Sequence, residues 1–369
     1  MLVYRPAASI AERARSFAAW AVSPSQGLRP KEDHSHMAVG FDPADSGVAS
    51  TPTDPIVSIC IPTFNGAPWI RDAIESALAQ SFSDLEVVVC DDASADGTVE
   101  LARQVDDERV RVVVNRERVG LARNWSRCVS ESRGIYIKFL MQDDRLAPDC
   151  IGRMVELLQE DPGVGLVFCP RQLEFDEPGD PQAIDFLQRF GEPHARLGPI
   201  ERVNDGRTLF AVMQRDRFRD NLIGEPTVVM VRREALVALG LFNVHLHQLT
   251  DLEMWLRISY FFRVGFISEP LATFRVHKRS ASVVNERSGG AWLDRVWLLE
   301  GLRVHPEIRK RLSSRAGARV WLLTYANAGK RLITDGPRAT RSHLRELGNY
   351  LRYRFQRRGH DVLHEPLVL

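Results

Sequence analysis

The chain has no disulfide or zinc pattern among its cysteines. Only five of its 369 residues are cysteine, and no two of them form a CxxC pair. Three of them, Cys60, Cys90 and Cys169, lie inside apolar runs. Small buried thiols in a reducing compartment explain these cysteines better than a disulfide framework or a zinc site. We therefore expect a cytoplasmic protein without disulfides.

The sequence also lacks an excess of charge and a long apolar run. Its 49 basic and 48 acidic side chains give a net charge of +1, which predicts no overall attraction to nucleic acid. The most apolar N-terminal stretch, residues 10–22, is too short and too charged to cross a bilayer. No GxGxxG loop follows the first apolar run, which argues against a dinucleotide-binding dehydrogenase.

What the sequence does contain is an alternation of short apolar runs and amphipathic segments. The apolar runs are 57–61, 85–90, 110–114, 135–141 and 164–169, and helical patterns lie near 68–80, 96–105, 121–132 and 148–160. Later strands are expected at 227–231, 264–267 and 271–276, and helices at 233–239 and 251–260. Nearly continuous apolar runs are typical of strands that are covered on both faces. This order predicts an α/β fold with a mainly parallel sheet flanked by helices.

Three regions differ from this alternation. Residues 1–54 are rich in Pro, Ser, Gly and Asp, and are expected to form a flexible lead-in. Residues 171–221 are irregular in pattern, and are interpreted as an insertion or lid beside the site. Residues 288–369 have a helical pattern and predict a C-terminal helical region. The catalytic domain is therefore expected to span 55–287.

Polar and acidic residues follow three of the predicted strands. They are Pro62, Thr63 and Asn65 after the first run, Asp91 and Asp92 after the second, and Asp143 and Asp144 after the fourth. The carboxyl ends of parallel strands form the ligand crevice of an open α/β sheet, so these residues predict a binding site. For Asp91 and Asp92 the alternative is helix capping, which suits Asp96 better. For Asp143 and Asp144 it is a solvated turn, but two adjacent carboxylates repel unless a cation such as Mg²⁺ or Mn²⁺ neutralises them.

Six stretches together resemble glycosyltransferase family 2, whose members have the GT-A fold. They are VSICIPTFNG, VVVCDDASADGT, NRERVGLARNWSRCVSESRGIYIKFLMQDD, GEPTVVMVRREALVALGLFN, TDLEMWLRIS and FRVHKRSAS, in order between residues 55 and 282. The resemblance implies an inverting transfer of sugar from a UDP-sugar or another NDP-sugar. A glycan or a lipid-linked acceptor in cell-envelope or exopolysaccharide synthesis is the implied partner.

Two other functions remain open from the sequence. A sugar-phosphate nucleotidyltransferase also combines an α/β sheet with an acidic metal site, although no glycine-rich phosphate loop follows the first strand. A non-catalytic nucleotide-sugar-binding protein is the other alternative. It is kept open by Met141 and Thr250, which stand where the family usually has acids.

The resemblance also implies roles for single residues. Pro62, Thr63, Asn65, Asp91, Asp92 and Arg123 are the implied nucleotide-binding residues. The family's metal motif is usually Asp-x-Asp followed by a further Asp, and here Met141 occupies the first position. The role of holding Mn²⁺ or Mg²⁺ therefore passes to Asp143 and Asp144 together, with His277 at the metal or the diphosphate.

Asp251 is the implied catalytic base. It would take the proton of the acceptor hydroxyl while the nucleoside diphosphate leaves from the opposite face, which inverts the anomeric centre. Trp255 lies four residues further on and shares its helix face, so it is expected to wall the sugar or acceptor pocket. Because Thr250 replaces the family's usual Glu, one like charge that could raise the pKa of Asp251 is missing. Helix capping is the alternative role for Asp251.

The end of the chain is strongly basic. Residues 338–360 contain seven arginines and one glutamate, with Leu344, Leu347, Leu351 and Phe355 at helical spacing. A basic amphipathic helix of this kind can lie on the anionic inner face of a cell membrane. The alternative is a solvated helix with one buried stripe.

Overall fold

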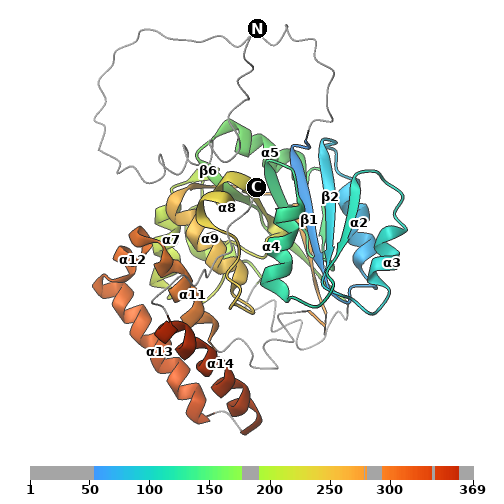
Figure 1. Cartoon of the computed structure of the whole chain (residues 1–369). Helices are drawn as coiled ribbons and strands as arrows, with labels where there is room; N and C mark the ends of the chain where they lie inside the picture. Colours follow the sequence, from blue (N-terminus) through green and yellow to red (C-terminus); the bar gives the residue numbers. More distant parts are fainter. Residues whose placement is uncertain (1–53, 177–190, 278, 281–292, 335–336, 357–369) are drawn as a thin grey trace, which may run out of the picture.

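The structure is a computed structural model that describes residues 54–176, 191–277, 279–280, 293–334 and 337–356 (Figure 1). The predicted lead-in therefore lies outside the described residues except for Asp54, and so does part of the predicted insertion. Within the described part, no helix combines the length and the apolar character that a membrane span requires.

A central sheet organises the fold. Its eight strands are β1 (Val57–Thr63), β2 (Leu85–Asp91), β3 (Val110–Val114), β4 (Tyr136–Phe139), β6 (Val164–Phe168), β8 (Val203–Asn204), β9 (Val229–Arg232) and β10 (Arg263–Phe266), in the order β3-β2-β1-β4-β9-β6-β10-β8. β9 is antiparallel to both neighbours and β8 to β10, whereas the other neighbouring pairs are parallel. This confirms the predicted α/β fold class.

Helices cover both faces of the sheet. They are α2 (Ile70–Leu78), α3 (Thr98–Arg103), α4 (Leu121–Glu131), α5 (Cys150–Glu160), α7 (Gly206–Arg215), α8 (Arg233–Leu239) and α9 (Thr250–Phe261). Figure 1 shows α2 and α4 on opposite faces of the β1–β2 half. Every residue of β1 and β2 is buried, as expected for strands covered on both sides. On α4, Ala122, Trp125 and Val129 recur at helical spacing and form its buried face.

A small second sheet brings the end of β11 to the site. It contains β5 (Arg145–Leu146), β11 (Ala272–Val276) and β7 (Arg171–Phe175), in that order. β11 pairs antiparallel with β5, with Thr273 opposite Arg145. This pairing fixes the segment after β4 beside the segment that ends in His277.

The region 171–221 is more regular than predicted. It contains β7, the 3₁₀ turn η1 (Pro193–Leu197), β8 and the ten-residue helix α7, which packs on α9. Asp205 caps α7 by accepting the Thr208 N–H at 2.7 Å. The charged residues of this region obscured the pattern that buries Leu209, Phe210 and Met213. The strand expected at 227–231 begins at Val229, because the 3₁₀ turn η2 (Pro226–Val228) precedes it.

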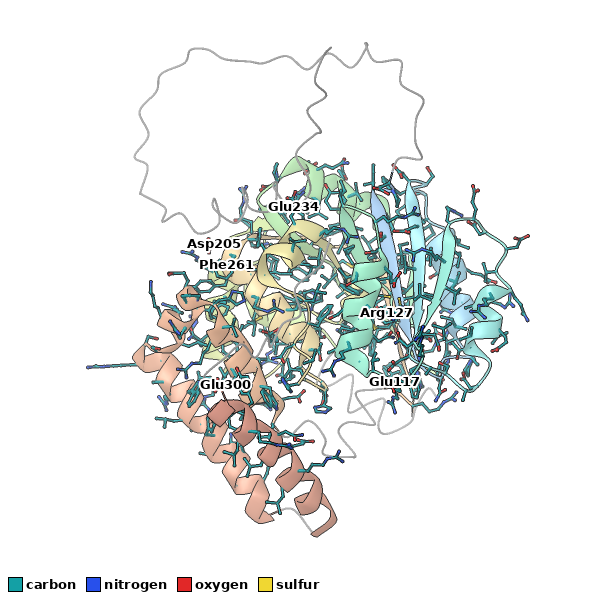
Figure 2. The ribbon with its side chains drawn as sticks, in the orientation of Figure 1. Glu117, Arg127, Asp205, Glu234, Phe261 and Glu300 are labelled. Carbon is teal, nitrogen blue, oxygen red and sulfur yellow. The ribbon has the colours of Figure 1, made fainter. Side chains whose placement is uncertain are left out.

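The C-terminal region is helical, as predicted. Its helices are α11 (Asp294–Val304), α12 (Pro306–Leu312), α13 (Arg315–Thr334) and α14 (Pro337–Gln356). α11 packs on α9, while α13 and α14 extend from this side of the molecule (Figure 1). Glu300 of α11, labelled in Figure 2, accepts hydrogen bonds from the hydroxyls of Tyr325 and Tyr350 at 3.1 and 3.2 Å. These hydrogen bonds join α13 and α14 to α11, which in turn packs on the sheet domain.

Candidate active site

The loops after β1 and β2 meet at the carboxyl edge of the sheet. The Asn65 N–H donates to Ser94 Oγ at 2.8 Å, and Asn65 Oδ1 accepts the Ala95 N–H at 3.1 Å. Asn65 has a φ of +50°, in the left-handed region that asparagine tolerates. Three nucleotide-binding residues were predicted in this part of the chain. Pro62 and Thr63 are buried at the end of β1, whereas Asn65, in the loop that follows, is exposed.

Asp91 and Asp92 are buried and hold backbone in place. The Asp92 carboxylate accepts the N–H groups of Val119 and Gly120 at 2.7 and 2.9 Å, just before α4. Asp91 accepts hydrogen bonds from the Ser94 N–H and hydroxyl. Neither aspartate caps α3, which follows Gly97 in the left-handed region. A nucleotide contact through these carboxylates stays a prediction.

Arg123 is exposed near the start of α4, at the same edge. Beside it lies a pair that the sequence did not reveal: the Arg118 guanidinium carbon is 4.0 Å from the centroid of the Phe64 ring. A cation over a ring face is attracted by the ring's quadrupole. Phe64 follows Thr63 directly. Its position just after the first predicted strand could have indicated an aromatic ring at the ligand crevice.

The two adjacent aspartates after β4 differ sharply in environment. Asp144 is 1% exposed, and its oxygens accept the Thr227 hydroxyl and the Arg275 N–H. Burial, followed by the charge of Asp143, raises the pKa of Asp144 well above its usual value. The Asp143 side chain is 18% exposed and contacts His277. Of the two residues that the prediction left together, the structure favours Asp143 for contact with a cation.

His277 is oriented by its neighbours. Its Nδ1 accepts the Arg279 N–H at 3.1 Å, so its Nε2–H points to Asp143 Oδ2 at 2.9 Å. The ring stacks on Trp69 with centroids 4.0 Å apart, and the Arg279 guanidinium carbon lies 4.5 Å from the Trp69 ring. In this arrangement Nε2 offers a hydrogen to Asp143, and the role of His277 at the metal or the diphosphate stays a prediction.

The donor set fits a cation that is held mainly by its substrate. Among the described residues, no three His, Cys, Asp or Glu side chains form a group that could hold a metal ion. Asp143 supplies one accessible carboxylate, and Mg²⁺ is commonly bound by one or two carboxylates together with substrate phosphates. The residues present therefore suit Mg²⁺ or Mn²⁺ carried with a diphosphate, and not a cage made by protein alone.

Asp251 lies in the first turn of α9 with a pKa suited to a base. Its Oδ2 accepts the Asn221 Nδ2–H at 2.9 Å and its Oδ1 the Leu252 N–H at 2.7 Å. Burial raises the pKa of Asp251 to about 7, and although these hydrogen bonds oppose the rise, the charge of Glu225 adds to it. The like charge that Thr250 does not provide thus comes from Glu225, a residue distant in sequence.

The segment 221–228 joins Asp251 to the acids after β4. Asn221 binds Asp251, while Thr227 binds Asp144 at the other end of the segment. Between them, the charge of Glu225 raises the pKa of both aspartates. Glu225 is itself ion-paired with Arg171 at 2.7 Å. The segment 221–228 therefore links Asp251 to Asp144, and the expectation that Asp251 and Asp143 face one ligand stays a prediction.

A second set of hydrogen bonds links this cluster to the nucleotide loops. The Thr63 carbonyl accepts the Asp92 N–H at 2.8 Å, and the Thr63 hydroxyl donates to Gln142 Oε1. Gln142 Oε1 also accepts the Phe64 N–H at 2.8 Å. The loops after β1, β2 and β4 thus form one connected surface at the carboxyl edge.

Trp255 does not have the predicted position. Its side chain is fully buried, and its indole N–H donates to the Gly224 carbonyl at 3.1 Å. Among the described residues it is inaccessible, and it supports the 221–225 segment through the Gly224 carbonyl. The shared helix face of Trp255 and Asp251 did not determine which of the two side chains reaches the surface.

These features define a class of protein. The sheet is mainly parallel, and its carboxyl edge carries the loops after β1 and β2, an accessible aspartate and a carboxylate of near-neutral pKa. This combination is typical of GT-A transferases. The chain belongs to glycosyl transferase family 2, whose model matches residues 58–239.

Relatives and solved structures agree with this assignment. The uncharacterized protein MT1568 of Mycobacterium tuberculosis is 32% identical over 304 residues, which cover 82% of this chain and 92% of MT1568. TuaG of Bacillus subtilis, a glycosyltransferase assigned to teichuronic acid biosynthesis, is 28% identical over 62% of this chain and 82% of TuaG. The crystal structure of S. aureus TarS 1–349 matches with a TM-score of 0.55 over 80% of each chain. At 13% identity, the match to TarS shows the shared fold alone.

Proposed function

We propose that the protein is an inverting glycosyltransferase that moves a sugar from a nucleoside-diphosphate sugar to an acceptor hydroxyl. One observation supports this most directly: the part-buried Asp251 carboxylate, with a pKa of about 7, is linked through the segment 221–228 to the acids after β4. A general base is most effective when its pKa is near the working pH. Glycosidic transfer needs such a base beside a diphosphate leaving group.

The residues have distinct roles in this reaction. Asp251 takes the proton of the acceptor hydroxyl, and Asn221 keeps its carboxylate oriented. Asp143 would hold Mg²⁺ or Mn²⁺, whose charge would neutralise the departing diphosphate. The Nε2–H of His277 orients Asp143 and can donate to a phosphate oxygen. Attack from the face opposite the leaving group inverts the anomeric carbon, so an α-linked donor gives a β-linked product.

The donor and acceptor classes are inferred from the relatives. TarS 1–349 was solved in complex with UDP-GlcNAc, at a TM-score of 0.52 and 15% identity. TuaG is assigned to teichuronic acid biosynthesis. We therefore propose a UDP-sugar donor and a glycan or lipid-linked acceptor in envelope polysaccharide synthesis. We also propose that the basic helix α14 makes a peripheral membrane contact, so that the enzyme acts at the inner face of the cell membrane.

Donor turnover tests the proposal. Wild type and Asp251→Asn are incubated with UDP-GlcNAc, UDP-glucose, UDP-galactose and GDP-mannose, each with Mn²⁺, with Mg²⁺ or with EDTA. We expect nucleoside diphosphate release by the wild type with metal, a loss of at least about 100-fold in Asp251→Asn, and unchanged UDP binding in both. UDP binding without turnover in either protein would support the non-catalytic alternative. Pyrophosphate release from UTP and a sugar phosphate would support the nucleotidyltransferase alternative.

A further inference from the structure

The helix that carries Asp251 has no capping side chain of its own. Leu249 is at its N-cap position and makes no side-chain cap hydrogen bond. The Thr250 hydroxyl donates to the Leu246 carbonyl at 3.3 Å. Asp251 accepts only the Leu252 N–H from this helix end. Backbone N–H groups at a buried helix start need acceptors, so the cap must come from elsewhere.

Asp294 supplies it from the C-terminal region. Its carboxylate accepts the N–H groups of His247, Gln248 and Leu249 at 3.1, 2.6 and 2.9 Å, and contacts the His247 ring at 3.3 Å. Asp294 is 1% exposed and begins α11. A carboxylate held by several N–H groups at a helix N-terminus also complements the helix dipole. One side chain therefore fixes the three residues that lead into α9.

The rest of this loop also rests on α11. Asn243 Nδ2 donates to the Trp297 carbonyl at 3.3 Å, and the His245 ring stacks on the Trp297 ring at 4.1 Å and 10°. Trp297 is 4% exposed. The connection between α8 and α9 thus takes its conformation from a helix that follows it in the chain. Both α9 and α11 lie beyond residues 58–239, the part matched by the family model.

We infer that Asp294 is a positioning residue for catalysis: by holding the N-cap residue of α9 and the two residues before it, Asp294 fixes the start of the helix and with it the Asp251 carboxylate. This inference rests on the proposed role of Asp251. A displacement of about 1 Å at a reacting group can lower a rate about 100-fold, so a loosened α9 start has a direct effect on turnover. Nucleotide binding, which depends on loops after β1 and β2, is unaffected.

The experiment compares Asp294→Ser, Asp294→Ala and the matched control Asp205→Ala. Asp205, labelled in Figure 2, caps α7 through the Thr208 N–H at 2.7 Å and contacts none of the residues proposed for catalysis. The serine variant keeps a short acceptor, so it is the milder change if the alanine variant does not fold. Each variant is measured for amide hydrogen exchange over residues 244–256, UDP affinity, and release of UDP or GDP from the four nucleotide sugars with Mn²⁺ across pH.

For Asp294→Ser we expect amide exchange at 247–252 to rise about tenfold, because a cap hydrogen-bonding network is lost. The rate of donor turnover falls about tenfold or more, while the Kd for UDP stays within about twofold. The pH midpoint of activity moves below 7, because water that reaches Asp251 lowers its pKa. Asp205→Ala keeps the wild-type rate and midpoint, whatever its loss of stability.

Three results would overturn the inference. They are unchanged exchange at 247–252 in Asp294→Ser, increased exchange with unchanged turnover and midpoint, and an equal loss of turnover in Asp205→Ala at the same folded fraction. Failure of the proposed function gives a different result, in which the wild type releases no nucleoside diphosphate or Asp251→Asn retains full turnover. Hydrogen exchange reports on the cap even in that case, because it does not depend on activity.

Discussion

At the scale of single residues, Asp251 combines a catalytic and an energetic role. Its carboxyl has an ordinary pKa of 3.8, which burial raises to about 7 in the folded chain. A raised folded-state pKa means that the folded protein binds the proton more tightly than the unfolded chain does. The stability that this provides is fully present below pH 4 and is lost progressively as the pH rises through 7.

We therefore predict opposite pH dependences for activity and stability. Donor turnover should rise with pH through about 7, because the base must be ionised. The free energy of unfolding of wild type, relative to Asp251→Asn, should fall by up to about 4 kcal/mol between pH 4 and 8. Urea denaturation of both proteins across this range measures the difference. A constant difference across the range would show that Asp251 titrates as an ordinary surface aspartate.

Asp143 and Asp144 should separate cleanly in function. Asp143→Asn removes the accessible carboxylate, so we predict that Mn²⁺-dependent turnover falls at least about 100-fold with little change in melting temperature. Asp144→Asn alters the buried contacts to Thr227 and Arg275, so its main effect should be on stability. Manganese titrations and thermal unfolding of the two variants measure this split. Equal metal dependence in both variants would contradict it.

The position of a site residue could be predicted from the sequence where the residue belongs to a short motif. Short motifs predicted that Asn65 follows β1, that Asp143 follows β4, and that Asp251 lies at the start of a helix, and the structure has all three positions. Partners across the fold could not be predicted. Glu225 influences Asp251 over 26 positions of sequence, and Trp69 stacks on His277 from the N-cap position of α2. Such pairs depend on tertiary packing, for which a single sequence has no local signal.

At the scale of elements, strands were easier to predict than the region 171–221. Strands covered on both faces, such as β1 and β2, are nearly continuous apolar runs, and their pattern is local. α7 buries only part of its surface and lies between charged loops. The helical spacing of its apolar residues was therefore hard to recognise in the sequence. The cap of α9 was equally hidden, because Asp294 lies 43 positions after Asp251.

The inner face of α9 gives a test at this scale. Arg257 and Glu253 are fully buried and ion-paired at 3.0 Å, and Arg257 also donates to the carbonyls of Leu239, Gly240 and Leu241. Removing one partner of a buried pair leaves the other charge in the interior. We predict that Arg257→Met lowers the free energy of unfolding by about 3–5 kcal/mol, measured by urea denaturation.

The matched control for this prediction is Arg202→Met. Arg202 pairs with Glu160 at 2.8 Å on the surface, with side chains 47% and 52% exposed. A surface pair of this kind contributes about 0–1 kcal/mol. Similar losses in the two variants would show that the Arg257 pair does not stabilise the turn between α8 and α9.

At the scale of the whole molecule, the C-terminal helices give it a basic, partly apolar side. On α14, Leu344 and Leu351 are 56% and 42% exposed and lie seven residues apart, with exposed Arg345 and Arg352 beside them. Apolar side chains flanked by arginines suit the boundary between headgroups and acyl chains of an anionic membrane. The lipid-linked acceptor that we propose would lie at the same membrane surface.

We therefore predict that the full chain sediments with vesicles containing phosphatidylglycerol and not with phosphatidylcholine vesicles, and that high salt weakens this binding. The double variant Leu344→Asp with Leu351→Asp should bind about tenfold more weakly, because two apolar contacts become repulsive charges. Leu322→Asp is the control, since Leu322 is 71% exposed on α13 without belonging to the α14 surface. An equal loss of vesicle binding in the Leu322→Asp control would show that binding depends on general charge and not on the α14 surface. No vesicle binding by the wild type would show that α14 is a solvated helix. Donor turnover without vesicles should be the same in all of these proteins, because Leu322, Leu344 and Leu351 are exposed side chains outside the proposed site.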